Sequence, residues 1–187
     1  LRKISSEIIA TNRGGNKGMH GFIAEVAEVG VGNAWQHIVG KNAIYTLLDD
    51  NGPVDLLRNG TEIQQKFSMS GGQFSLGAVA KHLAKYPDYI NNGGKYQIPK
   101  DHFETVEQLR SMSQEDANRL LTRGDAGPSL RQWRKVNDFF ESNSLDIDSL
   151  EPARFEYKDV QRDVHQSVLE AEKESLRETD KSLRDAA

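Results

Sequence analysis

The chain has 187 residues, which is enough for one domain with a buried core and an additional segment. It contains no cysteine, which excludes disulfides, zinc–thiolate sites and cysteine nucleophiles and favours a cytoplasmic location. The formal net charge of −4 argues against a protein that coats nucleic acid through bulk positive charge, but it is compatible with a metal site built from carboxylates.

The N-terminal residues are predicted to form a short helix followed by a flexible loop. Residues 1–9 have apolar side chains at helical spacing. Residues 11–21 are rich in glycine, which is typical of a loop, and they carry Arg13 and Lys17. The glycines lack the spacing of a nucleotide-binding loop, so a linker is the preferred interpretation and contact with a DNA backbone the second.

From Met19 the apolar residues at positions 22, 23, 26 and 29 predict an amphipathic helix. It is expected to end near Gly30 or Gly32 and to carry Glu25 and Glu28 one turn apart. The following residues, 34–50, fit a helix or a strand, because their β-branched and aromatic side chains and their spacing point in different directions.

Residues 53–68 give the clearest signal, two strand-like runs joined by Asn59 and Gly60. This pair favours a type I′ turn, which requires positive φ at both positions. The turn fixes a register in which Asp55 lies opposite Gln64. Alternation then separates two faces, a polar one with Asp55, Leu57, Glu62, Gln64 and Lys66 and an apolar one with Val54, Leu56, Ile63 and Phe67.

Further helices and a strand are predicted after the hairpin. Asp101 and Glu104 resemble a capping box at the start of one of these helices. Another helix carries a basic cluster with Trp133 available for stacking. The predicted helices are 74–86, 101–112, 111–123 and 129–142, the strand lies within 93–101, and the basic cluster is Arg131, Arg134 and Lys135.

The C-terminal part differs from the rest in charge. Residues 151–187 carry ten acidic and seven basic side chains, so most of the net charge lies there, and apolar residues are sparse. This composition predicts an exposed helix, or one that forms against a partner. The expected organisation is a domain at 1–150 and a charged helical extension at 151–187, through which the chain forms a homo-oligomer or belongs to a larger protein.

The polar face of the hairpin has the chemistry that phosphodiester hydrolysis requires. A carboxylate and an amide or second carboxylate hold Mg²⁺ or Mn²⁺ through oxygen, and a nearby lysine stabilises charge at phosphorus or activates water. A solvated polar face is the alternative for the hairpin, as a solvent-facing position is for each glutamate of the helix.

The residues Pro53-Val-Asp55 and Gln64-Gln-Lys66 resemble motifs II and III of the PD-(D/E)xK restriction-endonuclease-like superfamily, in the QxK form found in type IV restriction enzymes. The order of predicted elements over residues 19–110, about half of the chain, is also similar. The resemblance implies a small central mixed sheet flanked by helices, an α/β fold.

The resemblance also implies roles for individual residues. Asp55 would be the central metal ligand, Gln64 would stand where an acid is usual, and Lys66 would be the catalytic lysine. The helical glutamate would be Glu25 or Glu28, with Glu25 preferred because it follows the apolar pair at 22 and 23. Glu62, on the same face as Gln64, is a further ligand candidate that would compensate for the missing acid.

The implied function is metal-dependent cleavage of DNA, or less readily RNA, by an endonuclease or exonuclease. Such domains occur in restriction systems, mobile elements, phages and toxins. The basic residues expected to contact nucleic acid are Arg13, Lys17, Lys95 and Lys100. Two alternatives remain, an inactive domain of this fold that binds nucleic acid or a protein, and a structural domain of a larger protein. No apolar run is long enough to span a membrane, so no membrane partner is expected.

Overall fold

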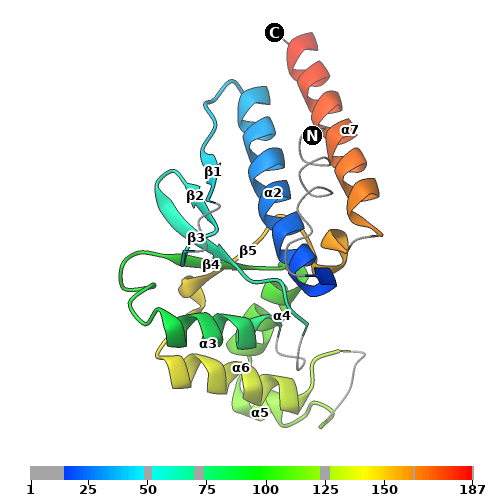
Figure 1. Ribbon diagram of the computed structural model, residues 1–187. Coiled ribbons are helices and arrows are strands. Elements are labelled where there is room, and N and C mark those ends of the chain that lie inside the picture. The colour runs from blue at the N-terminus through cyan, green and yellow to red at the C-terminus, as the bar shows by residue number, and fades with distance from the viewer. Residues whose placement is uncertain (1–14, 49–51, 70–73, 123–126, 162, 187) are drawn as a thin grey trace. The chain divides into compact units, whose positions relative to one another are not determined.

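The computed structural model describes residues 15–48, 52–69, 74–122, 127–161 and 163–186, and the side chains from residue 20 onward within these ranges. The chain divides into two compact units, one formed by residues 1–65 with 158–187 and the other by residues 66–157. Each unit combines helices with strands, so the architecture is α/β as predicted (Figure 1). No helix among the described residues is both long enough and apolar enough to cross a membrane.

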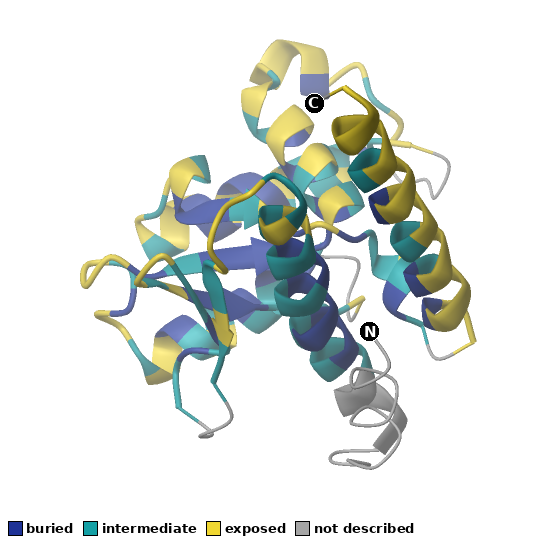
Figure 2. Ribbon diagram, turned by 90° about the horizontal axis from the view of Figure 1, so that it is seen from above, coloured by how far each residue is buried: buried dark blue, intermediate teal, exposed yellow. Residues whose placement is uncertain are grey.

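The first unit is built around one long helix. Helix α2 lies between an antiparallel meander of three strands and helix α7, and it packs against both (Figure 1). Its buried side chains lie between Ile23 and Val31 (Figure 2). The elements are α2 (Gly15–Ile38), β1 (Tyr45–Leu47), β2 (Leu56–Arg58), β3 (Thr61–Gln65) and α7 (His165–Asp185).

Helix α2 extends beyond the predicted range at both ends. The loop predicted for 11–21 is wrong from Gly15 onward, because these residues begin the helix, while residues 1–14 lie outside the described part. The predicted stop near Gly30 or Gly32 is also wrong. Gly32 instead allows a close approach, because a Cβ there would lie 2.6 Å from Cε2 of Tyr45.

Asn33 attaches the first strand to α2. Its Oδ1 accepts hydrogen bonds from the backbone N–H groups of Ile44 and Tyr45 at 3.0 and 2.9 Å, and its Nδ2 donates to the Tyr45 carbonyl at 2.8 Å. One amide therefore satisfies three backbone groups at the start of β1. The ambiguous stretch 34–50 thus contains the end of a helix, a connection and a strand.

The predicted hairpin is confirmed, and so is its register from Leu56 to Ile63; the predicted pairing of Asp55 with Gln64 is absent from the ladder. Leu56 pairs with Ile63, Leu57 with Glu62 and Arg58 with Thr61. Asn59 and Gly60 form the turn with φ of 50° and 82°, as a type I′ turn requires. Strand β2 pairs on its other edge with β1, in the register Tyr45↔Arg58 and Leu47↔Leu56.

The second unit contains a pair of parallel strands and a group of helices. Tyr96 pairs with Leu150, Gln97 with Glu151 and Ile98 with Pro152. Helix α4 packs against β5 and α6, and α6 also packs against α3 (Figure 1). The elements are α3 (Leu76–Lys85), β4 (Lys95–Ile98), α4 (Lys100–Ser111), α5 (Gln114–Ala117), α6 (Leu130–Asn143), η2 (Ile147–Ser149) and β5 (Leu150–Pro152).

The core of the second unit includes a buried tyrosine that is hydrogen-bonded to a half-buried histidine. Tyr96 is fully buried, and its hydroxyl lies 2.7 Å from Nδ1 of His82. Burial raises the pKa of Tyr96, so the hydroxyl keeps its proton and donates to the imidazole. The ring of Tyr89 packs at right angles to His82 and also contacts Tyr96.

Helices α3, α4 and α6 and strand β4 confirm predictions, but several details differ. The capping box predicted at Asp101 is wrong, because α4 begins after Pro99 and Asp101 accepts from the Tyr157 backbone N–H at 2.9 Å. The helix predicted over 111–123 is reduced to α5. A capping box does occur at the start of α6, between Ser129 and Gln132.

The C-terminal residues are organised differently from the predicted extension at 151–187. Residues 150–152 form β5, a strand that was not predicted, and η3 (Tyr157–Val160) follows. Helix α7 is helical as expected, but it buries Leu169 and Leu176 and packs against α2. The last thirty residues, 158–187, therefore group with the first unit.

Candidate metal centre

Asp55 lies immediately before β2, and its backbone leaves the regular ladder. Its N–H donates to the Ile63 carbonyl at 3.0 Å, although the strand partner of Ile63 is Leu56. Its carbonyl accepts from the Leu48 N–H at 2.9 Å. Two residues thus share one partner, as in a β-bulge, a feature that redirects a side chain at the end of a strand.

The side chain of Asp55 reaches the strand opposite. Its Oδ2 accepts a hydrogen bond from the Gln64 side-chain Nε2 and a second, of 2.8 Å, from the Gln65 backbone N–H. The predicted proximity of Asp55 and Gln64 is therefore present in their side chains. It arises from the bulge and not from regular pairing, which extends only from Leu56 to Arg58 on this strand.

Gln64 is buried, which the sequence pattern did not predict. It is 3% exposed, and among the described residues its Oε1 has no hydrogen-bond partner. An unpaired buried amide oxygen is costly, by about 1–3 kcal/mol, so such groups mark places where an additional partner fits. The oxygen belongs to the same amide whose nitrogen contacts the Asp55 carboxylate, so a carboxylate and an unsatisfied carbonyl lie side by side.

The two helical glutamates differ in burial. Glu28 is 4% exposed, whereas Glu25 is half-buried and its Oε1 lies near Gly21, one turn back on α2. Helix α2 packs against β3, the strand that carries Gln64. A buried carboxylate needs a positive charge or hydrogen-bond donors nearby, so burial makes Glu28 the better candidate, in contrast to the preference for Glu25.

Glu62 lies on β3 opposite Leu57 and is exposed. It is two residues from Gln64 and on the same side of the strand, but the burial of the strand increases sharply between these positions. Among the described residues, no three His, Asp or Glu side chains form a group that could hold an ion. Amide oxygens such as that of Gln64 are a different type of ligand.

Lys66 is the first residue of the second unit and follows Gln65 directly in the chain. Its backbone N–H donates to the Gln97 carbonyl at 2.8 Å, so its backbone is held by the strand β4. The side chain is half-buried. Two features thus fix the main chain on either side of the Gln65–Lys66 bond, the Asp55 carboxylate at Gln65 and β4 at Lys66.

The basic residues expected to contact nucleic acid have several different environments. Lys95 donates from Nζ to the Asp148 carbonyl, and Lys100 lies 4.0 Å from Glu104 in an exposed ion pair on α4. Arg13 lies outside the described residues, and Lys17 is in α2 with its side chain not described. The indole of Trp133, proposed for stacking, donates its N–H to the Met112 carbonyl at 3.1 Å.

A buried polar cluster in the second unit had no signal in the sequence. Ser75 and His102 are both buried, and Ser75 Oγ lies 3.1 Å from His102 Nδ1. The other ring nitrogen lies 3.1 Å from the Met69 sulfur, and the ring stacks on Tyr157. Burial lowers the pKa of His102, and the charge of Asp101 opposes this shift in part.

Comparisons of the chain with protein-family models, with curated proteins and with solved structures found no match.

Proposed function

We propose that this chain is a Mg²⁺-dependent nuclease of the PD-(D/E)xK type that hydrolyses phosphodiester bonds, with DNA preferred over RNA. The observation that carries the proposal is the contact between Asp55 and Gln64. A carboxylate lies there beside a buried amide whose oxygen has no partner in the part of the chain that the structure describes. Carboxylate and carbonyl oxygens are the ligands that Mg²⁺ uses, together with retained water.

The residues of this contact fit a magnesium ion if the Gln64 amide rotates. At present its nitrogen faces Asp55 and its oxygen is unsatisfied. A rotation of the amide by half a turn would exchange the two atoms and direct the oxygen toward the carboxylate. Two oxygens facing each other repel unless a cation lies between them, so the rotated state requires an ion.

In the proposal, Asp55 and the rotated Gln64 hold the ion, and Glu28 or Glu25 contributes from α2. The bound ion would polarise the phosphate and lower the pKa of a bound water. The Gln65 N–H keeps the Asp55 carboxylate oriented. Lys66, next in the chain, would offer its ammonium group to the phosphate, whose charge increases during the reaction.

A second candidate function is an inactive domain that binds nucleic acid or a protein through the same fold. The Gln64 nitrogen donates to Asp55, so the carboxylate is satisfied without a metal ion. A glutamate at this position would repel Asp55 in the absence of metal. The amide thus favours a stable metal-free state, which an inactive domain would retain.

Cleavage assays distinguish the two functions. The chain is incubated with plasmid, linear DNA and RNA in Mg²⁺, Mn²⁺ or EDTA, beside Asp55→Asn and Lys66→Met. Metal-dependent cleavage is expected, with loss in the first variant and a decrease of roughly 10²–10³-fold in the second. Asp88→Asn, which changes an exposed acid of the second unit, is the matched control and should retain activity.

Glu25→Gln and Glu28→Gln identify the helical ligand in the same assay. The larger loss of cleavage is expected for Glu28→Gln, with thermal unfolding used to correct for any loss of folded protein. The nuclease proposal would be abandoned if no metal supported cleavage, or if Asp55→Asn cleaved as fast as the original chain.

A further inference from the structure

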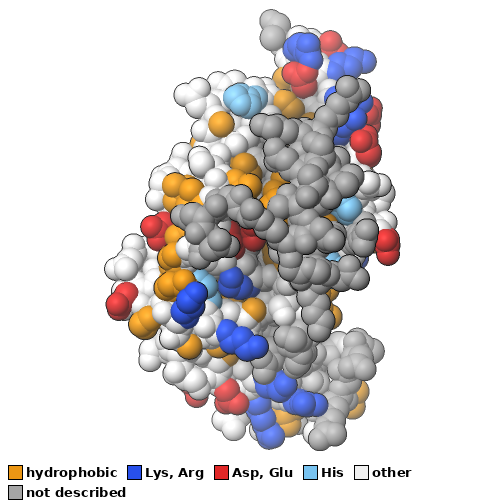
Figure 3. Space-filling view, viewed as in Figure 1, with side chains coloured by type: hydrophobic (Ala, Val, Ile, Leu, Met, Phe, Trp, Pro, Cys, Tyr) orange, Lys and Arg blue, Asp and Glu red, His pale blue; other side chains and the backbone are white. Residues whose placement is uncertain are grey.

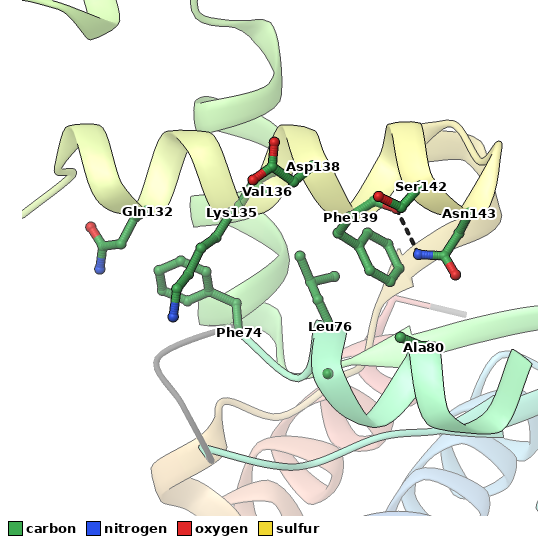
Figure 4. A pocket seen from close by; sticks show the side chains of 11 residues that line it. Phe74, Leu76, Ala80, Gln132, Lys135, Val136, Asp138, Phe139, Ser142 and Asn143 are labelled. Atoms are coloured by element: carbon green, nitrogen blue, oxygen red, sulfur yellow. Dashed lines mark hydrogen bonds between the residues drawn. The ribbon is translucent and has the colours of Figure 1, made fainter. Parts of the chain in front are cut away.

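The second unit contains a slot between α3 and α6 that the proposed metal site does not use (Figure 4). Its volume is about 290 Å³. Pockets for small molecules run from roughly 300 to 1,000 Å³, so the slot suits one ring system and not a large cofactor. The walls come from the residues that lead into α3, from the first two turns of α3 and from one face of α6.

The slot is apolar in the middle and polar at both ends. Leu76 and Phe139 lie in the middle, with the ring of Phe74 toward the end where Lys135 projects (Figure 4). Asn143 lies at the opposite end, and its Nδ2 donates to the Phe139 carbonyl at 2.7 Å. Because its nitrogen is engaged, Asn143 can offer a ligand its amide oxygen as an acceptor. Aromatic walls with a cation at one end and an acceptor at the other match a flat polar ring joined to an anion.

The charge around the slot favours an anionic ligand. Helices α3 and α6 together carry five basic and two acidic side chains, although the whole chain has a net charge of −4. Lys135 and Asp138 line the slot, but the Asp138 carboxylate points away from Leu76 and Phe74 (Figure 4). Lys81, Arg131 and Arg134 of this group are exposed, and Lys and Arg side chains predominate over this region in Figure 3. By contrast, α7 carries six acidic and four basic side chains. A local positive field attracts phosphate groups.

The wall formed by Phe74 is held in an uncommon conformation. Phe74 and Ser75 both have positive φ, 47° and 68°, which costs a non-glycine residue energy. The conformation is maintained by the buried hydrogen bond between Ser75 and His102, and the His102 ring also packs edge-on against Phe74. Strain of this kind persists where the surrounding structure fixes a side chain, and here it fixes an aromatic ring at the slot.

We propose that the slot binds a single unstacked nucleotide of a single-stranded nucleic acid. This proposal rests on the proposed function, because it specifies the form of the nuclease's substrate. The base lies between Phe74 and Phe139, its amino group donates to the oxygen of Asn143, and its phosphate contacts Lys135. A base within a duplex is stacked on both faces and cannot enter. Aromatic side chains bind the faces of unpaired bases, and basic residues follow the backbone of the strand.

Binding in EDTA tests the slot independently of catalysis. Binding of a fluorescein-labelled strand of ten deoxyadenylate nucleotides is measured by fluorescence anisotropy. An unlabelled duplex and dAMP serve as competitors. The strand is expected to bind more tightly than the duplex, because only its bases are unstacked. dAMP is expected to compete weakly, because it lacks the neighbouring phosphates. Tighter binding of duplex or of dAMP would overturn the proposal.

Two substitutions on α3 form a matched pair. Ala80→Leu places a larger side chain in the slot, whereas Ala84→Leu makes the same change at an exposed position one turn later. Ala80→Leu is expected to bind the strand about tenfold more weakly, since the stacking of one base contributes about this factor to affinity. Ala84→Leu is expected to bind it as tightly as the original chain. Lys135→Gln should also weaken binding and reduce its dependence on salt.

The outcomes separate this proposal from the nuclease proposal. Normal strand binding by both Ala80→Leu and Lys135→Gln, with thermal stability unchanged, would overturn the slot whatever the cleavage assay gives. Loss of binding in these variants would support the slot even if no metal supported cleavage. Asp88→Asn, which lies outside the slot and outside the proposed metal site, should bind the strand like the original chain in EDTA.

Discussion

The amide of Gln64 presents two chemically opposite atoms within one small buried volume. Its nitrogen donates to Asp55, and its oxygen has no partner within the described ranges. A carboxylate at this position would bind a cation more strongly, but it would repel Asp55 whenever the ion is absent. In the proposed metal site, glutamine would therefore bind the ion more weakly than glutamate but would leave the ion-free protein more stable.

Gln64→Glu should make the protein less stable without metal and more responsive to it. We expect a loss of about 1–3 kcal/mol in EDTA, because two buried carboxylates become neighbours. Addition of Mg²⁺ should raise the melting temperature of this variant by more than that of the original chain. Thermal unfolding followed by circular dichroism measures both effects.

Gln65→Glu provides the control for that substitution. Gln65 is also buried, at 4% exposure, but it is the next residue on the strand and its side chain points to the other face. The Gln65→Glu variant should be less stable than the original chain in EDTA, and Mg²⁺ should not restore its stability. Equal recovery of the two variants would contradict a metal site at Gln64.

His102 should make stability depend on pH. Burial lowers its pKa from the ordinary 6.5, so the unfolded chain takes up a proton at a higher pH than the folded protein does. The stabilisation from neutral His102 is therefore complete above about pH 6.5 and decreases as the pH falls below it. Urea unfolding at pH 7.5 and pH 5.5 measures the change.

The pH effect of His102 is isolated by substitution. His102→Gln keeps a polar side chain that can bond to Ser75 but does not titrate in this range. The difference in unfolding free energy between the two pH values should be smaller in this variant than in the original chain. An undiminished difference would assign the pH dependence to other groups.

At the scale of single elements, the hairpin shows what local sequence can determine. Asn59 and Gly60 set the turn, and the turn sets the register, because both depend on neighbouring residues only. The departure at Asp55 was not predictable, since the bulge depends on the Leu48 N–H from the preceding connection. The side-chain contact with Gln64 was nevertheless anticipated.

Helix α2 shows why glycines misled the prediction of helix ends. Glycine usually weakens a helix, but at Gly32 the absence of a Cβ lets the Tyr45 ring of β1 approach. This reason depends on a residue thirteen positions away. Strand β5 also depends on residues distant in sequence, because it forms by pairing with β4, as at Gln97 and Glu151. The residues of β5 alone show no pattern that predicts a strand.

Gly32→Ala should be destabilising although alanine favours helices. The new methyl group would overlap the Tyr45 ring, which costs about 1–3 kcal/mol and exceeds the gain of up to about 1 kcal/mol in helix propensity. In a Tyr45→Ala background the overlap is removed, and the same substitution should become neutral or stabilising. Urea unfolding of the four proteins measures this coupling. Equal effects in both backgrounds would rule out the overlap.

At the scale of the whole molecule, the resemblance to a known superfamily implied the α/β class and periodicity predicted most of the helices, but neither predicted the two units into which the chain divides. The boundary expected at 150/151 follows a change in charge, whereas the units are defined by packing, with residues 158–187 joined to 1–65. The apolar residues Leu169 and Leu176 that make α7 part of the first unit are too sparse to stand out in the sequence.

Mg²⁺ should stabilise the protein as a whole if the proposed site binds it. A ligand that binds the folded chain raises its unfolding free energy by about 2.7 kcal/mol at a hundred times its dissociation constant. We expect a rise in melting temperature with Mg²⁺ that saturates, and no rise in Asp55→Asn. Na⁺ at equal ionic strength is the control for screening. Equal shifts in both proteins would contradict binding at Asp55.

The packing of α7 against α2 also has a consequence for the order of events during synthesis. Helix α2 leaves the ribosome early, but the residues that cover part of it, Leu169 and Leu176, are translated only after the whole second unit. Residues 66–157 can therefore fold while the face of α2 that will pack against α7 is still exposed. Nascent chains halted shortly before α7 should expose that face to chaperones, which bind such surfaces.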